Sequence, residues 1–422
     1  MSLVFLFSFL FLFSNLIAEQ LESIIPSHMV MSKILASYDK TEAPPSTESE
    51  EKTIIHVSLY VNSLASISDV SMEYSIDAQF TLSWDDTRLT CNPENQEKKT
   101  KCPKKRDIRE YFNNIWTPDL RFLHLKKVDF YQEPFPNLRL LLEPNGRIIY
   151  SKRLTVTLEC RMDVRHYPLD TQRCPLILCS YSLTDKELEL VWDESTIGVE
   201  IYPDAELTEF ELLSPVRTGI RKLHYKGADV NGLFSCVNAT FRFKRQNSYH
   251  LMYSYMLTTF IVIVSWMSFW LDVTAVPGRV SLGVTTLLTL TTSAGNIRER
   301  LPPVAYVTAI DVWVGFCSFF VFTALLEFPL ANYISRRPIP NPNSKKRLFV
   351  VKKQLQVKDA TSGNLHVVAS EHKDKSEIPT AVEEARTLDR ACRVLYPLLF
   401  IVFNSIYWPY YISAAKLDEN NT

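Results

Sequence analysis

Residues 277–292 read PGRVSLGVTTLLTLTT, a stretch in which serine and threonine recur between leucine and valine. As a helix turning by 100° per residue, this stretch places a mostly polar row of side chains on one side. A membrane-spanning helix with such a row has one face in water. Because one helix cannot enclose an aqueous path, we expect several copies to surround a pore. The predicted row consists of Ser281, Thr285, Leu288 and Thr292, and it continues through Gly295 to Glu299.

The alternative for this stretch is a packing helix whose hydroxyls bond to their own backbone carbonyls. We favour the pore because Pro277 and Gly278 are helix-breaking residues at the start of this stretch. They lie near the polar row and are placed to shape a constriction. The helix amino terminus carries partial positive charge and Arg279 adds a full one, so this entrance favours anions. Arg279 lies off the polar row and is assigned to the field at the entrance. Leu288, the large apolar residue on the row, is the predicted gate.

Four apolar runs in the second half of the chain are long enough to cross a membrane. The first, 251–271, carries no charge, and at 1.5 Å per residue it spans a hydrocarbon core of about 30 Å. We expect transmembrane helices 1–3 within residues 249–334 and a fourth within 391–414. The other three runs are 280–297, 304–326 and 394–412.

Flanking segments predict the membrane topology. Residues 1–18 predict a cleaved secretory signal, with a signal anchor as the alternative because no Lys or Arg precedes the apolar run. Residues 19–53 include a stretch rich in Pro, Ser and Glu and predict a disordered extracellular tether. Residues 335–390 carry 12 Lys and Arg against 7 Asp and Glu, which predicts a cytoplasmic loop. Four crossings then leave both termini, including the tail 415–422, outside the cell.

Residues 54–248 show short alternating apolar and polar runs separated by Pro, Asn and Gly. This pattern predicts an extracellular antiparallel β-sandwich, so the expected fold class is α+β, a sandwich followed by a four-helix transmembrane bundle. Asn238 and Asn420 begin Asn-x-Thr sequons and are predicted glycosylation sites on the external side.

The exported part contains six cysteines, which allow 15 disulfide pairings. Locality favours Cys91 with Cys102 and Cys160 with Cys174, because each pair brackets a short polar loop. The sequence leaves open whether the remaining two meet. Those two are Cys179 and Cys236, while Cys317 and Cys392 lie in or beside apolar helices and are expected to be reduced packing residues.

The composition excludes several classes of function. With 46 Lys and Arg against 47 Asp and Glu, the net charge of −1 gives no support to nonspecific nucleic-acid binding. The sequence contains no Gly-rich phosphate loop, HExxH or GxSxG motif, and its histidines show no metal-ligand spacing. We therefore expect no enzymatic activity, no cofactor, no metal site and no nucleic-acid partner.

An ordered set of motifs resembles the pentameric Cys-loop ligand-gated channels, in the anion-selective branch with glycine, GABA and glutamate-gated chloride receptors. Cys160 and Cys174 enclose RMDVRHYPLDTQR, which contains the Tyr167-Pro168-x-Asp170 element of that loop. The other matches are Trp84-x-Asp86-x-Arg88-Leu89, Trp116-Thr-Pro118-Asp119, Arg245 before the first span, and the stretch 277–292.

The resemblance implies a homo- or hetero-pentamer in the plasma membrane, postsynaptic, with a transmitter site between subunits and a chloride pore. Tyr181, the Phe234 region and residues 116–122 would form the principal binding face. Tyr167, Pro168, Asp170 and Arg245 would couple binding to opening, and Arg298 matches a basic ring at the outer mouth. The complementary binding face would contain Gln79, Thr81, Arg139, Ser151 and Arg153.

One departure bears on the ligand. Amino-acid-gated relatives place an arginine three residues before the match to Trp84, and here that position is Thr81. A desolvated carboxylate needs a charge-assisted partner. The arginines that could substitute are Arg121, Arg139 and Arg153.

Aromatic residues offer a different ligand. Tyr181, Phe234, Tyr225 and Phe122 would surround an ammonium by cation–π contact, although packing within the sandwich is the alternative for each of them. This aromatic set favours a biogenic amine or a choline-like cation as the transmitter. The alternatives are an amino-acid-gated channel and a non-conducting or auxiliary subunit of a heteromeric chloride channel.

Overall fold

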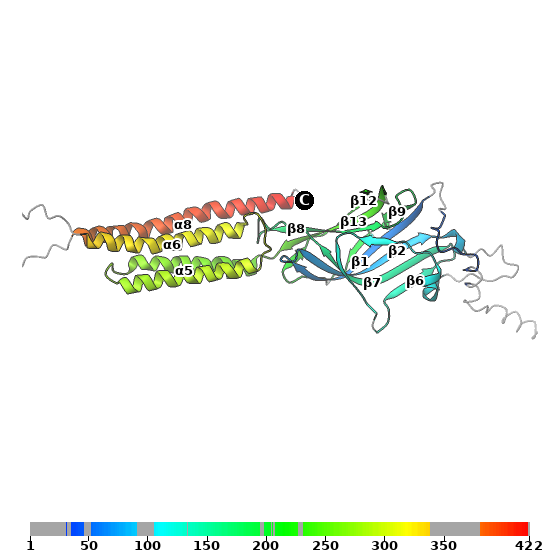
Figure 1. The fold of residues 1–422 in the computed structure, drawn as a ribbon, viewed down its shortest axis with the longest axis horizontal. Helices are drawn as coiled ribbons and strands as arrows, with labels where there is room; N and C mark the ends of the chain where they lie inside the picture. Colours follow the sequence, from blue (N-terminus) through cyan, green and yellow to red (C-terminus); the bar gives the residue numbers. More distant parts are fainter. Residues whose placement is uncertain are drawn as a thin grey trace, which may run out of the picture. The chain divides into compact units, whose positions relative to one another are not determined.

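The computed structural model describes residues 31, 35–45, 52–90, 105–132, 134–194, 198–203, 205, 207–226, 231–337 and 380–420. The chain divides into two compact units (Figure 1). The β unit comprises Met1–Asp163 and Thr171–Gln246, and the helical unit comprises Val164–Asp170 and Asn247–Thr422. The tip of the Cys160–Cys174 loop therefore belongs to the helical unit, whereas both cysteines belong to the β unit.

The described strands of the β unit form two sheets. The first has the order β10-β1-β2-β7-β6-β3, with β5 on β7 and β9 on β1, and the second has the order β11-β13-β8-β4, with β12 on β13. The strands of the first sheet are β1 (Thr53–Ser68), β2 (Glu73–Asp85), β3 (Arg106–Asp107), β5 (Leu125–Phe130), β6 (Leu138–Leu142), β7 (Arg147–Glu159), β9 (Leu188–Trp192) and β10 (Val199–Ile201). Those of the second are β4 (Leu120–Phe122), β8 (Thr171–Ser180), β11 (Phe210–Leu212), β12 (Arg217–Lys226) and β13 (Asn231–Arg245).

The core of the β unit follows from the alternation along its strands. From Thr53 to Val61 of β1, and from Tyr74 to Trp84 of β2, every second residue is buried, as expected where one face of a sheet packs against a core. Trp84 and Trp116 meet edge to face at 5.9 Å in the main cluster, which includes Leu178 and Val237 from the second sheet. The predicted sandwich is confirmed.

Part of the predicted disordered tether is instead ordered against this core. Met31 is 1% exposed, and Leu35 and Tyr38 pack on the same cluster. The Tyr38 hydroxyl donates to Asp86 at 2.8 Å, and burial raises its pKa above the ordinary value. The prediction for 19–53 is therefore wrong for residue 31 and for 35–45, because their apolar side chains find a surface that composition does not reveal. The other residues of 19–53, except 52 and 53, lie outside the described residues, as do Cys91, Cys102 and the signal 1–18.

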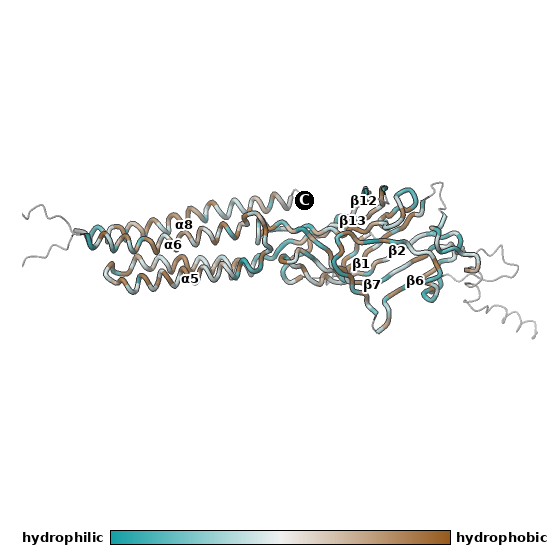
Figure 2. Tube along the Cα trace, in the orientation of Figure 1, coloured by the Kyte–Doolittle hydropathy of each residue, from teal (hydrophilic) through white to brown (hydrophobic). Residues whose placement is uncertain are grey.

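The described residues of the helical unit form four long helical segments. Hydrophobic residues recur along α5, α6 and α8 (Figure 2). The stretches Ser248–Trp270, Ala309–Arg336 and Val382–Leu417 are long and apolar enough to cross a membrane. The helices are α3 (Ser248–His250), α4 (Leu257–Trp266), α5 (Val276–Glu299), α6 (Ala309–Arg336) and α8 (Thr380–Asn420), with a π segment (Leu251–Met256) and a 3-10 segment (Met267–Trp270) around α4.

The second and fourth predicted spans differ from the sequence-based expectation in hydropathy and in length, respectively. The predicted second span corresponds to α5, but its serines and threonines lower its hydropathy, so it is not among the three apolar stretches. The predicted fourth span, 391–414, lies within a longer helix, because α8 begins at Thr380 and continues to Asn420. The last part of the expected cytoplasmic loop thus continues directly into the transmembrane helix.

Candidate ligand-binding surfaces and pore-lining helix

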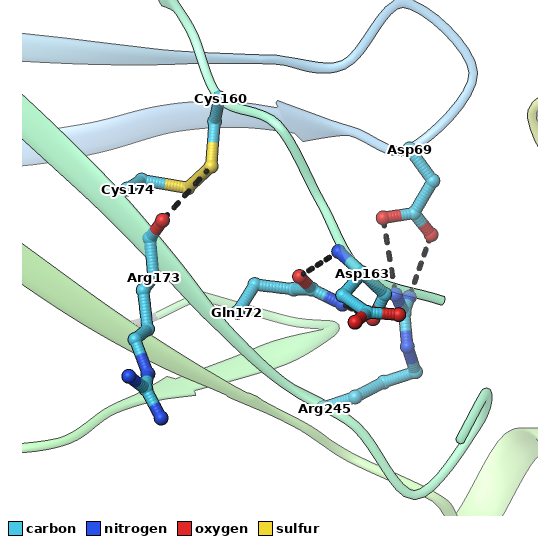
Figure 3. The surroundings of a disulfide bond; sticks show 7 residues. All are labelled: Asp69, Cys160, Asp163, Gln172, Arg173, Cys174 and Arg245. Carbon is cyan, nitrogen blue, oxygen red and sulfur yellow. Dashed lines mark hydrogen bonds and ion pairs between the residues drawn. A yellow bond between two sulfur atoms is a disulfide. The ribbon is translucent and has the colours of Figure 1, made fainter. Parts of the chain in front are cut away.

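Two disulfides are formed among the described residues of the β unit. Cys160 and Cys174 are bonded with their Cα atoms 5.1 Å apart, and the Gln172 side chain braces the adjacent backbone at Asp163 by one donated and one accepted hydrogen bond (Figure 3). Cys179 and Cys236, whose pairing the sequence left open, are also bonded. They are register partners on β8 and β13. The second disulfide therefore crosses directly between neighbouring strands.

The predicted coupling residues are buried in specific contacts. Arg245, at the end of β13, is 4% exposed and forms two contacts with Asp69, Nη1–Oδ2 at 2.7 Å and Nη2–Oδ1 at 3.0 Å (Figure 3). The turn between β1 and β2 is thereby tied to the last strand. Within the helical unit, the Tyr167 hydroxyl lies 3.2 Å from Nδ1 of His250, next to the cis peptide bond at Pro168. Asp170 is also buried.

Three of the predicted ligand-binding residues form one cluster on the second sheet. The guanidinium carbon of Arg121 lies 5.3 Å from the ring centre of Tyr181 and 5.9 Å from that of Tyr225. The Tyr181 backbone N–H donates to the carbonyl of Asp119, which fixes the end of β8 beside β4. Both tyrosines are about half exposed. Among the described residues no carboxylate pairs with Arg121, so the cluster offers an uncompensated cation between two accessible rings.

The structure does not place the two phenylalanines in this cluster. Successive residues of a strand point to opposite faces, so Phe122 points away from Arg121 and meets Phe80 edge to face at 4.9 Å inside the sandwich. Phe234 is 2% exposed. Phe234 is therefore packed inside the sandwich, whereas Phe122 is half-buried and also lines an open cavity of about 430 Å³ together with Arg121. A ligand-binding role for either phenylalanine stays a prediction.

The residues predicted for the complementary face do come together. Thr81 on β2 is the register partner of Ser151 on β7, which is in turn the partner of Arg139 on β6. The Ser151 hydroxyl contacts both Gln79, at 2.8 Å, and Thr81, at 2.9 Å. Two open cavities of about 520 and 400 Å³ adjoin this row, and both are lined by Gln79 and Arg139.

Charge distinguishes the arginines of this surface. Arg153 is paired with Asp77, at 3.0 Å between Nε and Oδ1, and hydrogen bonding to Asp77 raises the pKa of the guanidinium. Arg109, which lines the larger cavity, is paired with Asp107. Arg139 is exposed and pairs with no carboxylate among the described residues. Arg139 is therefore the cation that this surface has available for a ligand.

Helix α5 presents the predicted polar row on an exposed face. Pro277, Gly278, Ser281, Thr285, Leu288 and Thr292 are all exposed, whereas Gly283, Thr286 and Leu290 are buried. The hydroxyl of Thr285 also donates to the carbonyl of Ser281 at 2.7 Å, so bonding back to the helix occurs on the exposed face itself. Gly283 allows close packing, because a Cβ there would lie 2.5 Å from Cδ1 of Leu325 on α6.

Arg279 differs from the sequence-based expectation. Its side chain is buried and contacts Asp389 on α8 at 2.5 Å and 3.1 Å. Glu327 on α6 lies 3.7 Å from the same guanidinium. The expected full positive charge at the entrance is therefore compensated inside the subunit, because a buried guanidinium requires a partner. Arg298 is exposed at the other end of α5 and pairs with Asp311 at 3.0 Å.

Comparison with known proteins covers both units. A family model described as the neurotransmitter-gated ion-channel ligand binding domain matches residues 27–247, and one described as the neurotransmitter-gated ion-channel transmembrane region matches residues 254–362. The chain is 33% identical to a glutamate-gated chloride channel of Drosophila melanogaster, over 92% of each chain. It is 32% identical to glycine receptor subunit beta-type 4 of Caenorhabditis elegans, over 91% of this chain and 88% of that protein.

Proposed function

Because this chain belongs to the neurotransmitter-gated ion-channel family, in its anion-selective Cys-loop branch, we propose that it forms a chloride channel opened by a carboxylate-bearing amino acid. The family consists of pentameric ligand-gated channels of the membrane rather than enzymes. The ligand class is the new part of the proposal. The observation that carries it is Arg121, which lies near Tyr181 and Tyr225 and pairs with no carboxylate in the described part of the chain.

A guanidinium in this position disfavours a cationic transmitter. An ammonium held about 5 Å from Arg121 would be repelled by roughly 3 kcal/mol at an effective dielectric constant of about 20. A carboxylate at the same place gains a charge-assisted hydrogen bond. The guanidinium already lies within 6 Å of both tyrosine ring centres, so a second cation between the rings would also lie close to Arg121. The amine expectation stays untested, but this geometry favours the amino-acid alternative.

The opposite surface supports the same ligand class. Arg139 offers a second unpaired guanidinium, and Glu200 lines the smaller of the two cavities there. A zwitterion such as an amino acid presents a carboxylate for an arginine and an ammonium for a glutamate. In a ring of identical subunits, one surface of each subunit meets a different surface of its neighbour. We place the transmitter where the Arg121 cluster of one subunit faces the Arg139 surface of the next. Both relatives are named for amino acids that carry such a carboxylate, glutamate and glycine.

Expression in oocytes tests the ligand class directly. We expect acidic and neutral amino acids, but not amines, to evoke currents that reverse at the chloride equilibrium potential. Arg121→Gln and Arg139→Gln should each raise the half-maximal concentration at least ten-fold. Arg109→Gln is the matched control, because that arginine lines the same cavity as Arg139 but is already paired.

Three outcomes would contradict the proposal. Activation by an amine that is strengthened in Arg121→Gln would favour the cationic transmitter. Reversal at the sodium potential would contradict anion selectivity. Silence alone combined with altered responses of co-expressed subunits would favour the auxiliary-subunit alternative.

The remaining part of the proposal concerns location. We place both termini outside a postsynaptic membrane, since four helical segments follow the predicted signal and the segment between α6 and α8 is predominantly basic. Antibody labelling of an epitope tag after Thr422 in intact cells should succeed, whereas a tag at residue 360 should need permeabilised cells.

A further inference from the structure

One face of α8 contacts the segment that leads into the pore-lining helix. Arg386, Asp389 and Arg393 are three and four residues apart, so they lie along one stripe of the helix. We call these three residues the α8 stripe. Each contacts a different point of residues 269–279, which run from the 3-10 segment after α4 into the first turn of α5. We call residues 269–279 the connection.

The outer two members of the stripe contact the first part of the connection. Arg393 Nε donates to the carbonyl of Phe269 at 3.0 Å, and its guanidinium lies 4.7 Å from the ring centre of Trp270. Arg386 lies 3.7 Å from the carboxylate of Asp272. The connection is thereby tied to α8 on either side of its bend.

The central member carries the buried contact. Asp389 is 2% exposed and binds Arg279 through both carboxylate oxygens, while Arg279 also donates to the carbonyl of Leu271. Arg279 directly follows Gly278, which lies on the exposed face of α5. Asp389 therefore determines where a cation next to the narrow end of the pore is held.

Formal charge gives the arrangement a consequence for ions. One guanidinium is buried with two carboxylates, because Glu327 also lies at 3.7 Å and neither of its oxygens has a hydrogen-bond partner among the described residues. The attraction for anions at this entrance then comes from the amino terminus of α5 rather than from Arg279. Removing one negative charge per subunit would add positive potential around the whole ring.

We propose that Asp389 is a positioning residue for conduction: it holds the charge of Arg279 inside the subunit and thereby limits the anion current through this end of the pore. The inference rests on membership of the anion-channel branch and not on the identity of the transmitter. A role in stability alone would change surface expression or open probability, whereas this role changes the conductance of each open channel.

Single-channel recording tests the role in conduction. In Asp389→Asn, the conductance for outward chloride movement should rise about two-fold relative to that for inward movement. The reason is that chloride moving out of the cell passes into the pore at this cytoplasmic end. Arg279→Gln should lower the conductance for outward chloride movement and make the pore permeable to sodium. The conductance and selectivity of the double variant should be close to those of the parent channel, and Asp389→Glu should also behave like the parent. Glu384→Gln, a change at an exposed position five residues earlier on α8, is the matched control.

Surface labelling tests the pairing without any agonist. Asp389→Asn leaves the buried Arg279 with only the more distant Glu327, and Arg279→Gln leaves buried carboxylates without their cation, so surface expression should fall several-fold in each single variant, and the double variant should recover it. Unchanged unitary conductance and selectivity in Asp389→Asn at normal surface density would overturn the proposal. A double variant no better at the surface than either single variant would overturn it as well.

Discussion

The backbone N–H of Trp116 donates a hydrogen bond to the Tyr38 hydroxyl at 3.0 Å, although 78 residues separate the two. The same hydroxyl accepts from Arg88 and donates to Asp86. Trp116 begins the segment that continues through Asp119 into Arg121. The amino-terminal residues 35–45 therefore brace the strand that carries the cation of the proposed ligand site.

This brace predicts the effect of Tyr38→Phe. The change removes three hydrogen bonds from a half-buried cluster and should lower the free energy of unfolding by about 1–3 kcal/mol. The half-maximal ligand concentration should rise several-fold, because Arg121 loses support. Thermal melting of the solubilised full-length protein and concentration-response curves measure the two effects. Tyr202→Phe, at an exposed tyrosine, should change neither, and equal behaviour of the two variants would refute the brace.

Leu288 predicts the position of the gate. Its side chain is 62% exposed, which makes it the largest apolar surface on the polar row of α5. A ring of threonines in its place would wet more easily than a ring of leucines. Leu288→Thr should shift the concentration-response curve at least ten-fold toward lower concentration or open the channel without ligand. Leu287→Thr, at the half-buried neighbour, is the control, and an unshifted curve for Leu288→Thr at normal surface density argues against this gate.

The cross-strand disulfide predicts a loss of stability on removal. Cys179 and Cys236 are 57 residues apart, and closing a loop of that length corresponds to about 4 kcal/mol in the chain-entropy description. Replacing both with serine should lower the melting temperature and weaken ligand response, since Cys179 is the register partner of Arg121. Cys317→Ala leaves both disulfides intact and serves as the comparison. Thiol labelling of the unreduced parent at Cys179 would show that the bond is not formed in cells.

Asn238 predicts an external glycan. It lies on β13 opposite Gly219 of β12, where a Cβ would come within 2.9 Å of the Asn238 side-chain oxygen. The glycine thus leaves room beside the acceptor amide. Asn238→Gln should remove one enzymatically cleavable glycan, visible as a mass decrease, and Gly219→Val should reduce its occupancy. Unchanged mass in Asn238→Gln after correction for the substitution would rule this acceptor out.

Local sequence patterns were sufficient to predict most of the secondary structure and its division into two units. The alternation in 54–248 predicted the sandwich, the apolar runs predicted the helical unit, and the spacing of serine and threonine predicted the exposed face of α5. These features depend on the two-residue repeat of a strand and the 3.6-residue repeat of a helix. Each repeat is visible within a single element and does not depend on contacts with distant residues.

Partnerships between distant residues required the tertiary structure. Arg279 lies 110 residues from Asp389, and nothing in either local pattern indicates that α8 passes the start of α5. Likewise the pairing of Cys179 with Cys236, and the alignment of Arg139 with Ser151 and Thr81, depend on strand order and register. Strand order and helix packing are chosen by the whole core, because a one-residue slip or a different neighbour would bury different side chains. Local periodicity therefore predicts which face of a helix or strand is exposed to solvent. Only the packing of the whole chain decides which charged residue from another element lies next to that helix or strand.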